Sequence, residues 1–495
     1  MPNSLHAIWS QLRLIYGWTD EKRKGRSISL ISTLLTSFYN VFITGIFYTG
    51  FLSMYEISLV GVGIITFISP LANCFSIFSP MVLERIQKRK WLLAGAKIYY
   101  YFMIIIATNL MPLLVTDPGQ RVVWFCLLQF LATAVYAVFS AGFTPWFYHF
   151  YPQDPAQRVA YLSYNQVFSS ILSSCILLLS GGLAVAVKSS GHQDALILGM
   201  RYFAFALVLL DVFFQVQAKE YPYPLLTSHV HLREVFRLSF AHPKYMRCLL
   251  VMFAWSYIGA LNSGTWNYYL LNTVGFSYGM INLSSVFCIV MLLLFTPFWR
   301  KVLGRMGWIR TFGLCVLIWV PSEVYFFFLT PITKWMYLPG VLFQNFLSVG
   351  MNLSYSNIFY LNLPEKNATT HTCFQVVFCN LFSFLGMMTS TFWCSIFGED
   401  TVVYFGKIPT TAVQYSTLAR AVTMLILGIV LIRHWQALTP EDETTLLLNQ
   451  KHKHVRGVYS TMRIFTGKQL DMIGFPMGGI GAGMMCLQGR GSLGS

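Results

Sequence analysis

Four apolar segments of the chain carry polar side chains spaced so that they share one helix face. Residues three, four, seven or eleven positions apart lie on the same side of an α-helix. The four stripes are Thr33, Ser37, Asn40, Thr44 and Tyr48; Gln129, Thr133, Tyr136 and Ser140; Trp255, Gly259, Asn262, Trp266 and Tyr269; and Asn345, Ser348, Asn352 and Tyr355, with Gln344 beside the last. They contain amides, hydroxyls and aromatic rings, and no carboxylate, lysine or arginine. Because an amide both donates and accepts hydrogen bonds, such stripes suit a neutral, hydroxyl-rich ligand.

The amides and rings of these stripes are the candidate substrate-binding residues. They are Asn40, Gln129, Tyr136, Asn262, Trp266, Gln344, Asn345 and Asn352. A side chain such as Trp266 could offer a flat apolar face to a sugar ring, while a few polar groups set its orientation. The alternative is that these groups bond one helix to another, which contributes about 0.6–2 kcal/mol per hydrogen bond. Either explanation can hold for a single residue, but the four stripes together favour a cavity.

Five ionisable residues lie inside apolar segments, where a charge is costly and is therefore a candidate for function. Asp211 and Glu323 could each bind a proton or a sodium ion as a coupling site. A structural carboxylate with satisfied hydrogen bonds is the alternative for both. Lys97, Arg201 and Arg420 lie near the ends of apolar segments, where long side chains can reach the membrane interface. We expect no functional role for these three.

The elements that must position these residues are apolar segments long enough to cross a bilayer. A hydrocarbon core of about 30 Å needs about 20 apolar residues per helical crossing. We expect crossings at 28–52, 58–79, 91–115, 122–143, 160–186, 195–216, 247–271, 277–299, 310–329, 335–360, 373–397 and 417–434. With 56% hydrophobic and 11% charged residues, the chain has too little charge to cover a water-facing surface. The sequence therefore predicts an all-α membrane protein with twelve transmembrane helices in two six-helix bundles.

The basic residues fix the expected orientation. Of the 34 lysines and arginines, 27 lie on one side of the expected helices and four on the other, so both termini are expected in the cytoplasm. The domains expected are a surface-lying amphipathic segment 1–27, bundles 28–216 and 247–434, a cytoplasmic linker 217–246 and a cytoplasmic tail 435–495. The net charge of +16 comes from short clusters between apolar segments, which excludes nucleic-acid binding. No cysteine spacing suits a metal, and we expect no metal and no cofactor.

The two halves of the sequence repeat each other. Pro80 and Trp91 correspond to Pro297 and Trp308 at an offset of 217, and Pro155 and Gln166 correspond to Pro364 and Gln375 at an offset of 209. These pairs lie in equivalent loops of the two halves. Many transporters are built from such duplicated bundles, with the substrate site between the repeats.

This arrangement resembles the major facilitator superfamily over about residues 28–434. The superfamily's loop motif, Gly-x-x-x-Asp-Arg-x-Gly-Arg-Arg, aligns here with Pro80, Glu84, Arg85, Gln87, Lys88 and Arg89. Charge is kept, but both glycines are lost. In the second half, Gly304 and Arg305 match while Lys301 occupies the acidic position, and Pro155 with Arg158 resembles the superfamily's Pro-x-x-Arg element. The resemblance implies alternating access around a cavity lined by helices 1, 4, 7 and 10, with Glu84, Arg85, Arg158 and Arg305 as gating residues.

The tail contains a glycine-rich segment, Gly474-Phe475-Pro476-Met477-Gly478-Gly479-Ile480-Gly481. It resembles the opening segment of the non-lysosomal glucosylceramidase and β-glucosidase family over about 20 residues. The sequence stops before a catalytic domain, so it supplies no acid-base pair for glycoside hydrolysis. We expect either a truncated fusion of a transporter with a glycosidase, or a chance similarity in a disordered tail.

Together these features favour a secondary active or facilitative transporter of a neutral sugar or glycoside, with a proton or sodium ion as possible partner. An exporter of amphipathic compounds is the first alternative, because Phe, Trp and Met also line promiscuous pockets. A membrane-embedded enzyme or sensor is the second, but it should show clustered His, Asp or Glu at helix ends, and the sequence has no such cluster. We expect a monomer in a cell membrane, of bacterial type, and no enzyme activity.

Overall fold

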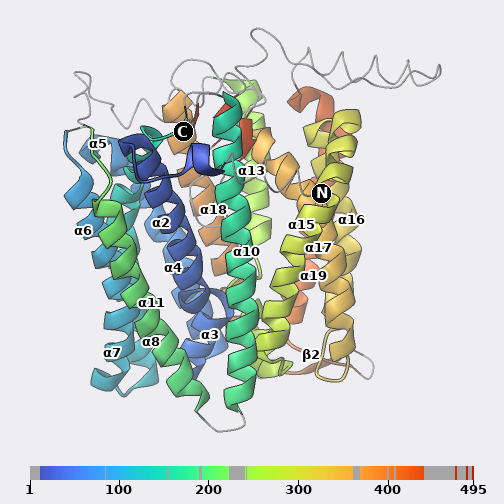
Figure 1. Cartoon of the computed structure of the whole chain (residues 1–495). Helices are drawn as coiled ribbons and strands as arrows, with labels where there is room; N and C mark the ends of the chain where they lie inside the picture. The colour runs from blue at the N-terminus through green and yellow to red at the C-terminus, as the bar shows by residue number, and fades with distance from the viewer. Residues whose placement is uncertain are drawn as a thin grey trace, which may run out of the picture. The chain divides into compact units, whose positions relative to one another are not determined.

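The computed structural model describes residues 12–83, 85–152, 155–188, 192–221, 240, 242–359, 368–398, 401–405, 408–439, 474–476, 486–488 and 493–494. The described chain is almost entirely helical, and within each of its two units the long helices run side by side (Figure 1). Helical segments occupy all twelve ranges in which crossings were expected. The all-α membrane fold predicted from the sequence is therefore confirmed.

The first half of the chain contains these elements in order: α2 (Glu21–Ile43), α3 (Gly45–Met54), α4 (Leu59–Asn73), η1 (Cys74–Phe78), α5 (Ser79–Leu83), α6 (Lys90–Tyr101), the π-helix η2 (Phe102–Ala107), α7 (Thr108–Leu114), α8 (Pro118–Ser140), α9 (Phe143–Tyr148), α10 (Pro155–Lys188) and α11 (Gln193–Val216). Residues 12–15 are also helical, and the helix of the first expected crossing begins at Glu21, seven residues earlier than expected. Part of the predicted surface-lying segment is therefore the first turns of a long helix.

The second half contains α13 (Pro243–Ala260), α14 (Trp266–Tyr268), the π-helix η3 (Tyr269–Thr273), α15 (Tyr278–Met306), α16 (Trp308–Phe327), η4 (Lys334–Met336), α17 (Tyr337–Ile358), α18 (Ala368–Phe397) and α19 (Ala412–Leu438). Between the last two helices, β1 (Val403–Phe405) pairs antiparallel with β2 (Ile408–Thr410). In the tail, β3 (Gly474–Pro476), β4 (Cys486–Gln488) and β5 (Leu493–Gly494) form a three-stranded antiparallel sheet.

Nine helices in the described part of the chain are long and apolar enough to span a membrane, or ten if the bent helix α15 counts as one span. The two expected crossings that do not qualify contain α13 and α17. Both carry polar stripes, and α13 also begins with Lys244 and Arg247, which lowers its hydropathy. A helix that faces a polar neighbour inside a bundle needs less hydrophobicity than one that faces lipid. The count of twelve crossings stays a prediction.

The first and seventh expected crossings are broken, which the sequence did not predict. α2 ends at Ile43, Thr44 is extended, and Gly45 restarts the helix with a positive φ of 59°. Residues 261–265 likewise form turns between α13 and α14. The expectation of one continuous polar face is therefore wrong beyond these breaks, since a break changes the register on which i, i+4 spacing depends.

The described helices form two compact units. Unit 1 comprises Met1–Ile57 and Leu71–Val230, and unit 2 comprises Ser58–Pro70 and His231–Ser495. One core of unit 1 joins α2, α5, α6, α9 and the residues that follow α9 and α11. Its buried members are Ile28, Leu83, Leu93, Trp146, Phe150 and Ala218. The indole of Trp146 also donates a hydrogen bond to the Lys219 carbonyl, 3.1 Å away, so the chain beyond α11 is fixed to this core.

Small residues allow the closest helix packing in unit 2. A Cβ at Gly428 on α19 would collide with Leu317 on α16, and one at Gly313 would press on Leu431. On another face, a Cβ at Gly386 on α18 would collide with the backbone oxygen of Tyr257 on α13. Membrane helices associate through such close contacts, because lipid provides little hydrophobic drive between them. The tight α16–α19 pair brings together Glu323 and Arg420, the second of the two ion pairs described below.

Candidate functional site

A buried ion pair lies in unit 1 between the third and sixth expected crossings. Lys97 of α6 contacts Asp211 of α11, with Nζ and Oδ2 2.6 Å apart, and both side chains are buried. Tyr39 and Thr36 of α2 donate hydrogen bonds to the same carboxylate oxygen, at 3.2 and 3.3 Å. The expectation that Lys97 reaches the membrane interface is wrong. In a low-dielectric interior an ammonium group is held by a carboxylate rather than by distant water.

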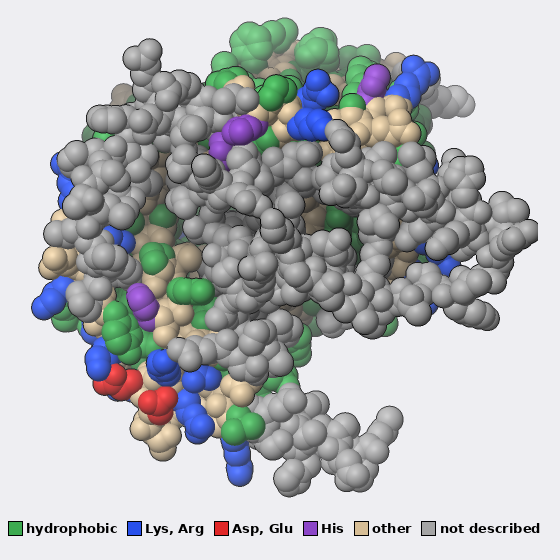
Figure 2. Space-filling view, turned by 90° about the horizontal axis from the view of Figure 1, so that it is seen from above, with side chains coloured by type: hydrophobic (Ala, Val, Ile, Leu, Met, Phe, Trp, Pro, Cys, Tyr) green, Lys and Arg blue, Asp and Glu red, His purple; other side chains and the backbone are tan. Residues whose placement is uncertain are grey.

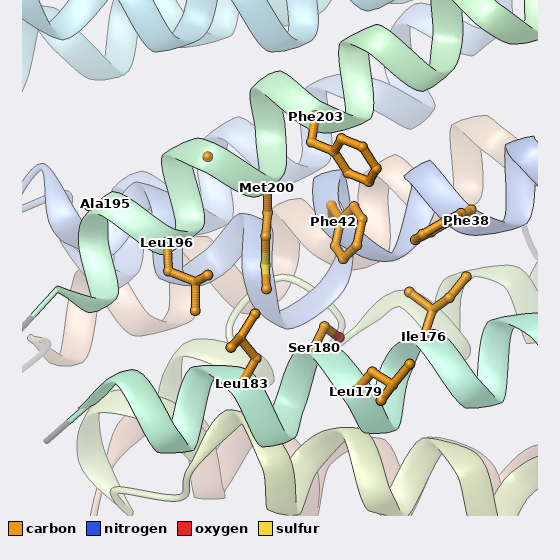
Figure 3. Close-up of a pocket in the computed structure, with 11 residues that line it drawn as sticks. Phe38, Phe42, Ile176, Leu179, Ser180, Leu183, Ala195, Leu196, Met200 and Phe203 are labelled. Carbon is orange, nitrogen blue, oxygen red and sulfur yellow. The ribbon is translucent and has the colours of Figure 1, made fainter. Parts of the chain in front are cut away.

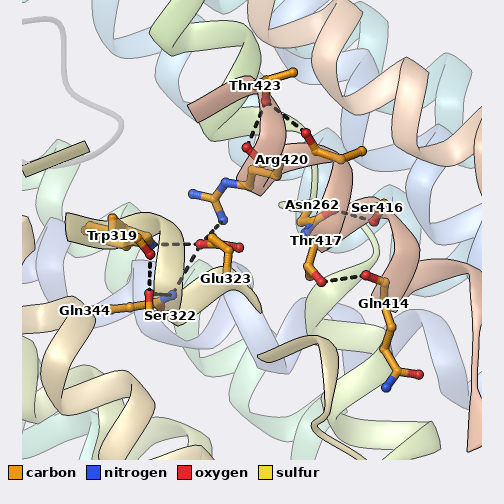
Figure 4. Close-up of polar contacts among 11 residues, drawn as sticks. Asn262, Trp319, Ser322, Glu323, Gln344, Gln414, Ser416, Thr417, Arg420 and Thr423 are labelled. Carbon is orange, nitrogen blue, oxygen red and sulfur yellow. Dashed lines mark hydrogen bonds and ion pairs between the residues drawn. The ribbon is translucent and has the colours of Figure 1, made fainter. Parts of the chain in front are cut away.

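A second ion pair lies in unit 2, between α16 and α19. Arg420 Nη1 lies 3.2 Å from Glu323 Oε1, and the Arg420 side chain is only 18% exposed. The indole of Trp319 donates to the same oxygen at 2.7 Å (Figure 4). The expectation for Arg420 is therefore also wrong, because its guanidinium turns to a carboxylate inside the unit.

Gln344 of α17 joins this second network. Its Nε2 donates to Ser322 Oγ at 3.0 Å and to Glu323 Oε1 at 3.2 Å. Figure 4 shows the amide beside the carboxylate rather than directed away from it. Gln344 thus connects α17 to α16, which is the role that the helix-bonding alternative gives it.

Two further amides of unit 2 have partners inside the unit. Asn262, in the break after α13, accepts a hydrogen bond from Ser416 of α19 and is buried. Asn345 donates from Nδ2 to the Ser284 carbonyl of α15 at 3.1 Å. Beside them, the half-buried Trp266 ring packs edge-on against Phe326, with centroids 5.7 Å apart. These contacts stabilise the unit whether or not the residues also meet a substrate.

The remaining candidates differ in how accessible they are. Gln129 of α8 is buried, and the half-buried Tyr136 ring stacks on Tyr100 of α6 with centroids 4.5 Å apart. Asn40 of α2 is half-buried, and Asn352 of α17 is exposed. Of the eight candidate residues, Asn352 is therefore the one whose side chain is exposed. The binding role of all eight stays a prediction.

The loop expected to act as a gate is held by a residue that the sequence reasoning missed. The Glu220 carboxylate, just beyond α11, accepts hydrogen bonds from the backbone N–H groups of Arg89 and Lys90, the latter at 2.8 Å. It thereby caps the first turn of α6, where unpaired N–H groups favour an anion. Among the expected gating residues, Arg85 and Arg305 are exposed. Glu84 and the Arg158 side chain lie outside the described residues.

An apolar pocket of about 470 Å³ opens in unit 1 between α2, α10 and α11. It is lined by Phe38, Phe42, Ile176, Leu179, Ser180, Leu183, Ala195, Leu196, Gly199, Met200 and Phe203. In Figure 3 the side chains of Phe42, Leu183 and Met200 point into it from the three helices. Ser180 supplies the one hydroxyl of this lining, so the pocket suits an apolar group rather than a sugar.

A sequence signal for the two ion pairs did exist. Each half has charged residues of opposite sign on its third and sixth apolar segments, Lys97 with Asp211 and Glu323 with Arg420. A charge inside a membrane segment usually needs a partner on a neighbouring helix. Pairing the charges between segments would have placed all four residues in the interior.

Comparison with known proteins gives one family and one fold. The model of the family described as MFS/sugar transport protein matches residues 27–360. No curated protein sequence matches the chain. The nucleoside transporter NupG has a similar crystal structure, with a TM-score of 0.60 and 13% sequence identity, covering 84% of this chain and 100% of that one.

Two further solved structures share the fold. The D-xylose-proton symporter has a TM-score of 0.60 at 14% identity and covers 84% of this chain and 98% of its own. A bacterial homolog of the human lysosomal transporter Spinster, in an inward-facing and unoccupied conformation, has a TM-score of 0.58 at 14% identity, covering 85% and 98%. At these identities the likeness extends to the fold alone.

Proposed function

Because the chain belongs to the MFS/sugar transport protein family and is a multi-pass membrane transporter of a solute rather than an enzyme, we propose that its cargo is a neutral, hydroxyl-rich molecule such as a sugar or glycoside. The observation that carries this proposal is the internal pairing of Lys97 with Asp211 and of Glu323 with Arg420. Paired charges leave amides, hydroxyls and aromatic rings on the polar stripes to meet a substrate. A symporter of the same fold is named for D-xylose, which is consistent with such a cargo.

The proposed binding residues are the eight stripe residues, led by the exposed Asn352. The Asn352 side chain is exposed, whereas those of the other seven residues are buried or half-buried. An accessible amide can bond two hydroxyls of a sugar at once, one as donor and one as acceptor. Tyr136 and Trp266 would add apolar ring faces. Transport would follow by alternating access, either facilitated or coupled to an ion.

Replacing Asn352 by alanine tests this assignment. A substrate hydroxyl left without a partner costs about 1–3 kcal/mol, so affinity should fall roughly tenfold to a hundredfold. The measurement is the binding of a panel of labelled sugars and glycosides to purified protein, with Tm on the same samples. Asn357→Ala is the matched control, because Asn357 lies on the same helix and bonds the Leu353 carbonyl of its own backbone, at 2.8 Å. Unchanged affinity with a lowered Tm in Asn352→Ala would remove this residue from the site.

The exposed Arg85 provides a test of gating. If its charge holds one face of the transporter closed, Arg85→Ala changes the populations of the two states and leaves the binding site intact. We therefore expect a transport rate changed several-fold, with equilibrium substrate affinity within about twofold. Initial uptake rates into proteoliposomes and equilibrium binding separate the two quantities. Lys88→Ala, an equally exposed charge in the same loop, is the control. A normal rate in Arg85→Ala would mean that Arg85 is only a solvated surface charge.

Coupling to a proton or a sodium ion remains a proposal for Asp211 and Glu323. Either carboxylate would have to exchange its bonded cation for the transported ion. Asp211 is the better candidate, because its Oδ1 atom is buried without a hydrogen-bond partner among the described residues. Glu323, by comparison, is bonded to Trp319, Gln344 and Arg420 through Oε1.

The proposed location is a cell membrane, with a monomer whose termini both lie in the cytoplasm. The end of the structure viewed in Figure 2 carries many blue Lys and Arg side chains and few red acidic ones among the coloured residues. Exposed basic residues of the described helix ends and connecting segments include Lys22, Arg85, Lys88, Lys244, Arg247, Lys301 and Arg305. Basic loops are retained on the cytoplasmic side during insertion, which supports this orientation.

Two observations refine the cargo. The glycine-rich tail, with its likeness to the opening segment of β-glucosidases, favours a glycoside over a free sugar within the proposed class. The apolar pocket between α2, α10 and α11 favours instead the export of amphipathic compounds. The sugar panel decides between them when it includes alkyl glycosides of increasing chain length. Affinity that rises with chain length and is lost in Met200→Asn would support the export function.

A further inference from the structure

Arg201 is a fully buried cation whose hydrogen bonds, in the described part of the chain, go to neutral groups. It lies on α11 with no exposed surface. Its Nε donates to Asn109 Oδ1 at 2.6 Å, and its Nη2 donates to the Ile104 carbonyl at 2.7 Å and to Thr108 Oγ1 at 2.8 Å. The Phe51 ring covers the guanidinium, 3.8 Å from Cζ. The expectation that Arg201 reaches the membrane interface is therefore wrong.

No carboxylate among the described residues forms an ion pair with Arg201. The second half of the chain has an arginine at the equivalent helix position, and that arginine is paired with a carboxylate. Arg201 is the ninth residue of α11, and Arg420 is the ninth residue of α19. Arg420 is paired with Glu323, which lies in the third expected crossing of the second half. Arg201 instead contacts Asn109, which lies in the third expected crossing of the first half. Unit 1 therefore keeps the buried cation but has an amide in place of the acid.

Three buried polar atoms around this cation have no hydrogen-bond partner in the described part of the protein. They are Arg201 Nη1, Asn109 Nδ2 and Tyr48 Oη. The Asn109 amide touches the guanidinium through its oxygen, and the Tyr48 ring lies 5.8 Å from Arg201 Cζ. All three atoms can donate a hydrogen bond, and none has an acceptor. A buried charge without a counter-charge and several unsatisfied donors are each costly, so their coincidence indicates a missing anionic acceptor.

We propose that Arg201, Asn109 and Tyr48 bind a small inorganic anion, of which chloride is the physiological example. Complete burial of the donor atoms favours a monatomic anion over a substrate carboxylate or a bulky organic anion. A water molecule could accept the same hydrogen bonds but would leave the charge uncompensated. The anion would compensate the charge of Arg201 in unit 1, as the Glu323 carboxylate compensates the charge of Arg420 in unit 2. This site is independent of the neutral cargo proposed above.

Thermal unfolding of the purified protein in chloride and in gluconate, at equal ionic strength and in neutral detergent, tests the site. Chloride at many times its dissociation constant should raise Tm by about 2–4 °C or more, because it binds the folded state only. Asn109→Asp places a carboxylate where the amide oxygen already contacts Arg201. This variant should have the higher Tm in gluconate and lose the response to chloride.

Glu323→Gln is the reciprocal variant, because it leaves Arg420 with an amide as Arg201 has in the wild type. It should gain a second, additional response to chloride. A wild-type protein whose Tm is the same in chloride and gluconate would overturn the proposal, as would an Asn109→Asp variant that keeps the full response. A response to phosphatidylglycerol in chloride-free buffer, with none to chloride, would also overturn it and assign the cation to a lipid phosphate.

Discussion

Asp211→Asn is expected to lower the free energy of unfolding of unit 1 by about 3–5 kcal/mol, because it leaves the Lys97 ammonium buried without its carboxylate. The two charged atoms are 2.6 Å apart, and the Asp211 side chain has no exposed surface. Asparagine keeps the shape and an oxygen that can still accept from Tyr39. The variant therefore isolates the loss of charge from a loss of packing. Thermal or denaturant unfolding in detergent measures the effect.

An exposed ion pair of the same length serves as the control. Lys219 Nζ and Glu21 Oε2 are also 2.6 Å apart, but their side chains are 51% and 58% exposed. This hydrogen bond raises the pKa of Lys219, although water screens the pair. Glu21→Gln should therefore leave the stability almost unchanged. Equal losses in Glu21→Gln and Asp211→Asn would show that burial does not determine the strength of these pairs.

The double variant Lys97→Met, Asp211→Asn separates structure from coupling. With both charges removed, most of the lost stability should return, since a buried pair often contributes little more than apolar residues of its size. Transport by this variant then reports on coupling alone. Loss of uphill accumulation with retained downhill flux would support Asp211 as the coupling residue. Full accumulation would make the pair purely structural.

Gly386→Ala is the second large effect that we expect. The added methyl group would meet the backbone oxygen of Tyr257, which cannot move aside as a flexible side chain can. Helices α13 and α18 must then separate, which also disturbs the stacked rings of Phe253 and Phe382, 5.4 Å apart. Overpacking of this kind costs about 1–3 kcal/mol. We expect a correspondingly lower Tm.

Gly259→Ala is the matched control on the same helix pair. A Cβ at Gly259 would meet no atom within 4 Å, and the residue lies inside α13. Alanine loses less conformational entropy than glycine on folding, so this variant should be neutral or more stable by about 0.5–1 kcal/mol. If both alanine variants behave alike, the α13–α18 approach is looser than the structure describes.

The sequence predicted the fold well because membrane folds depend on local properties. A run of about 20 apolar residues must be helical in lipid, whatever its neighbours are. The helices of all twelve expected ranges and the family followed from such runs and from the repeat of Pro80 and Trp91 in the second half. The helix breaks at Thr44 and after Ala260 were not predicted, since Gly45 alone is a weak signal within an apolar segment.

The candidate site was predictable only in part. Polar stripes are a local pattern, so the sequence identified Asn345 and Gln344 as polar residues of one helix. Whether such an amide faces a ligand or a neighbouring helix depends on which helix lies beside it. In the structure Gln344 bonds to Glu323, and Asn345 bonds to the Ser284 carbonyl. The spacing of residues along one helix does not predict such partners on other helices.

By itself the sequence determined a membrane transporter of duplicated helices with a few isolated charges inside it. Only the tertiary structure decided that Lys97 meets Asp211, that Arg420 meets Glu323, and that Arg201 meets no acid among the described residues. The physical reason is that the energy of a charge in a membrane protein depends on what lies within a few ångströms of it. Those neighbours come from helices that are distant in the chain, and only their packing brings them together.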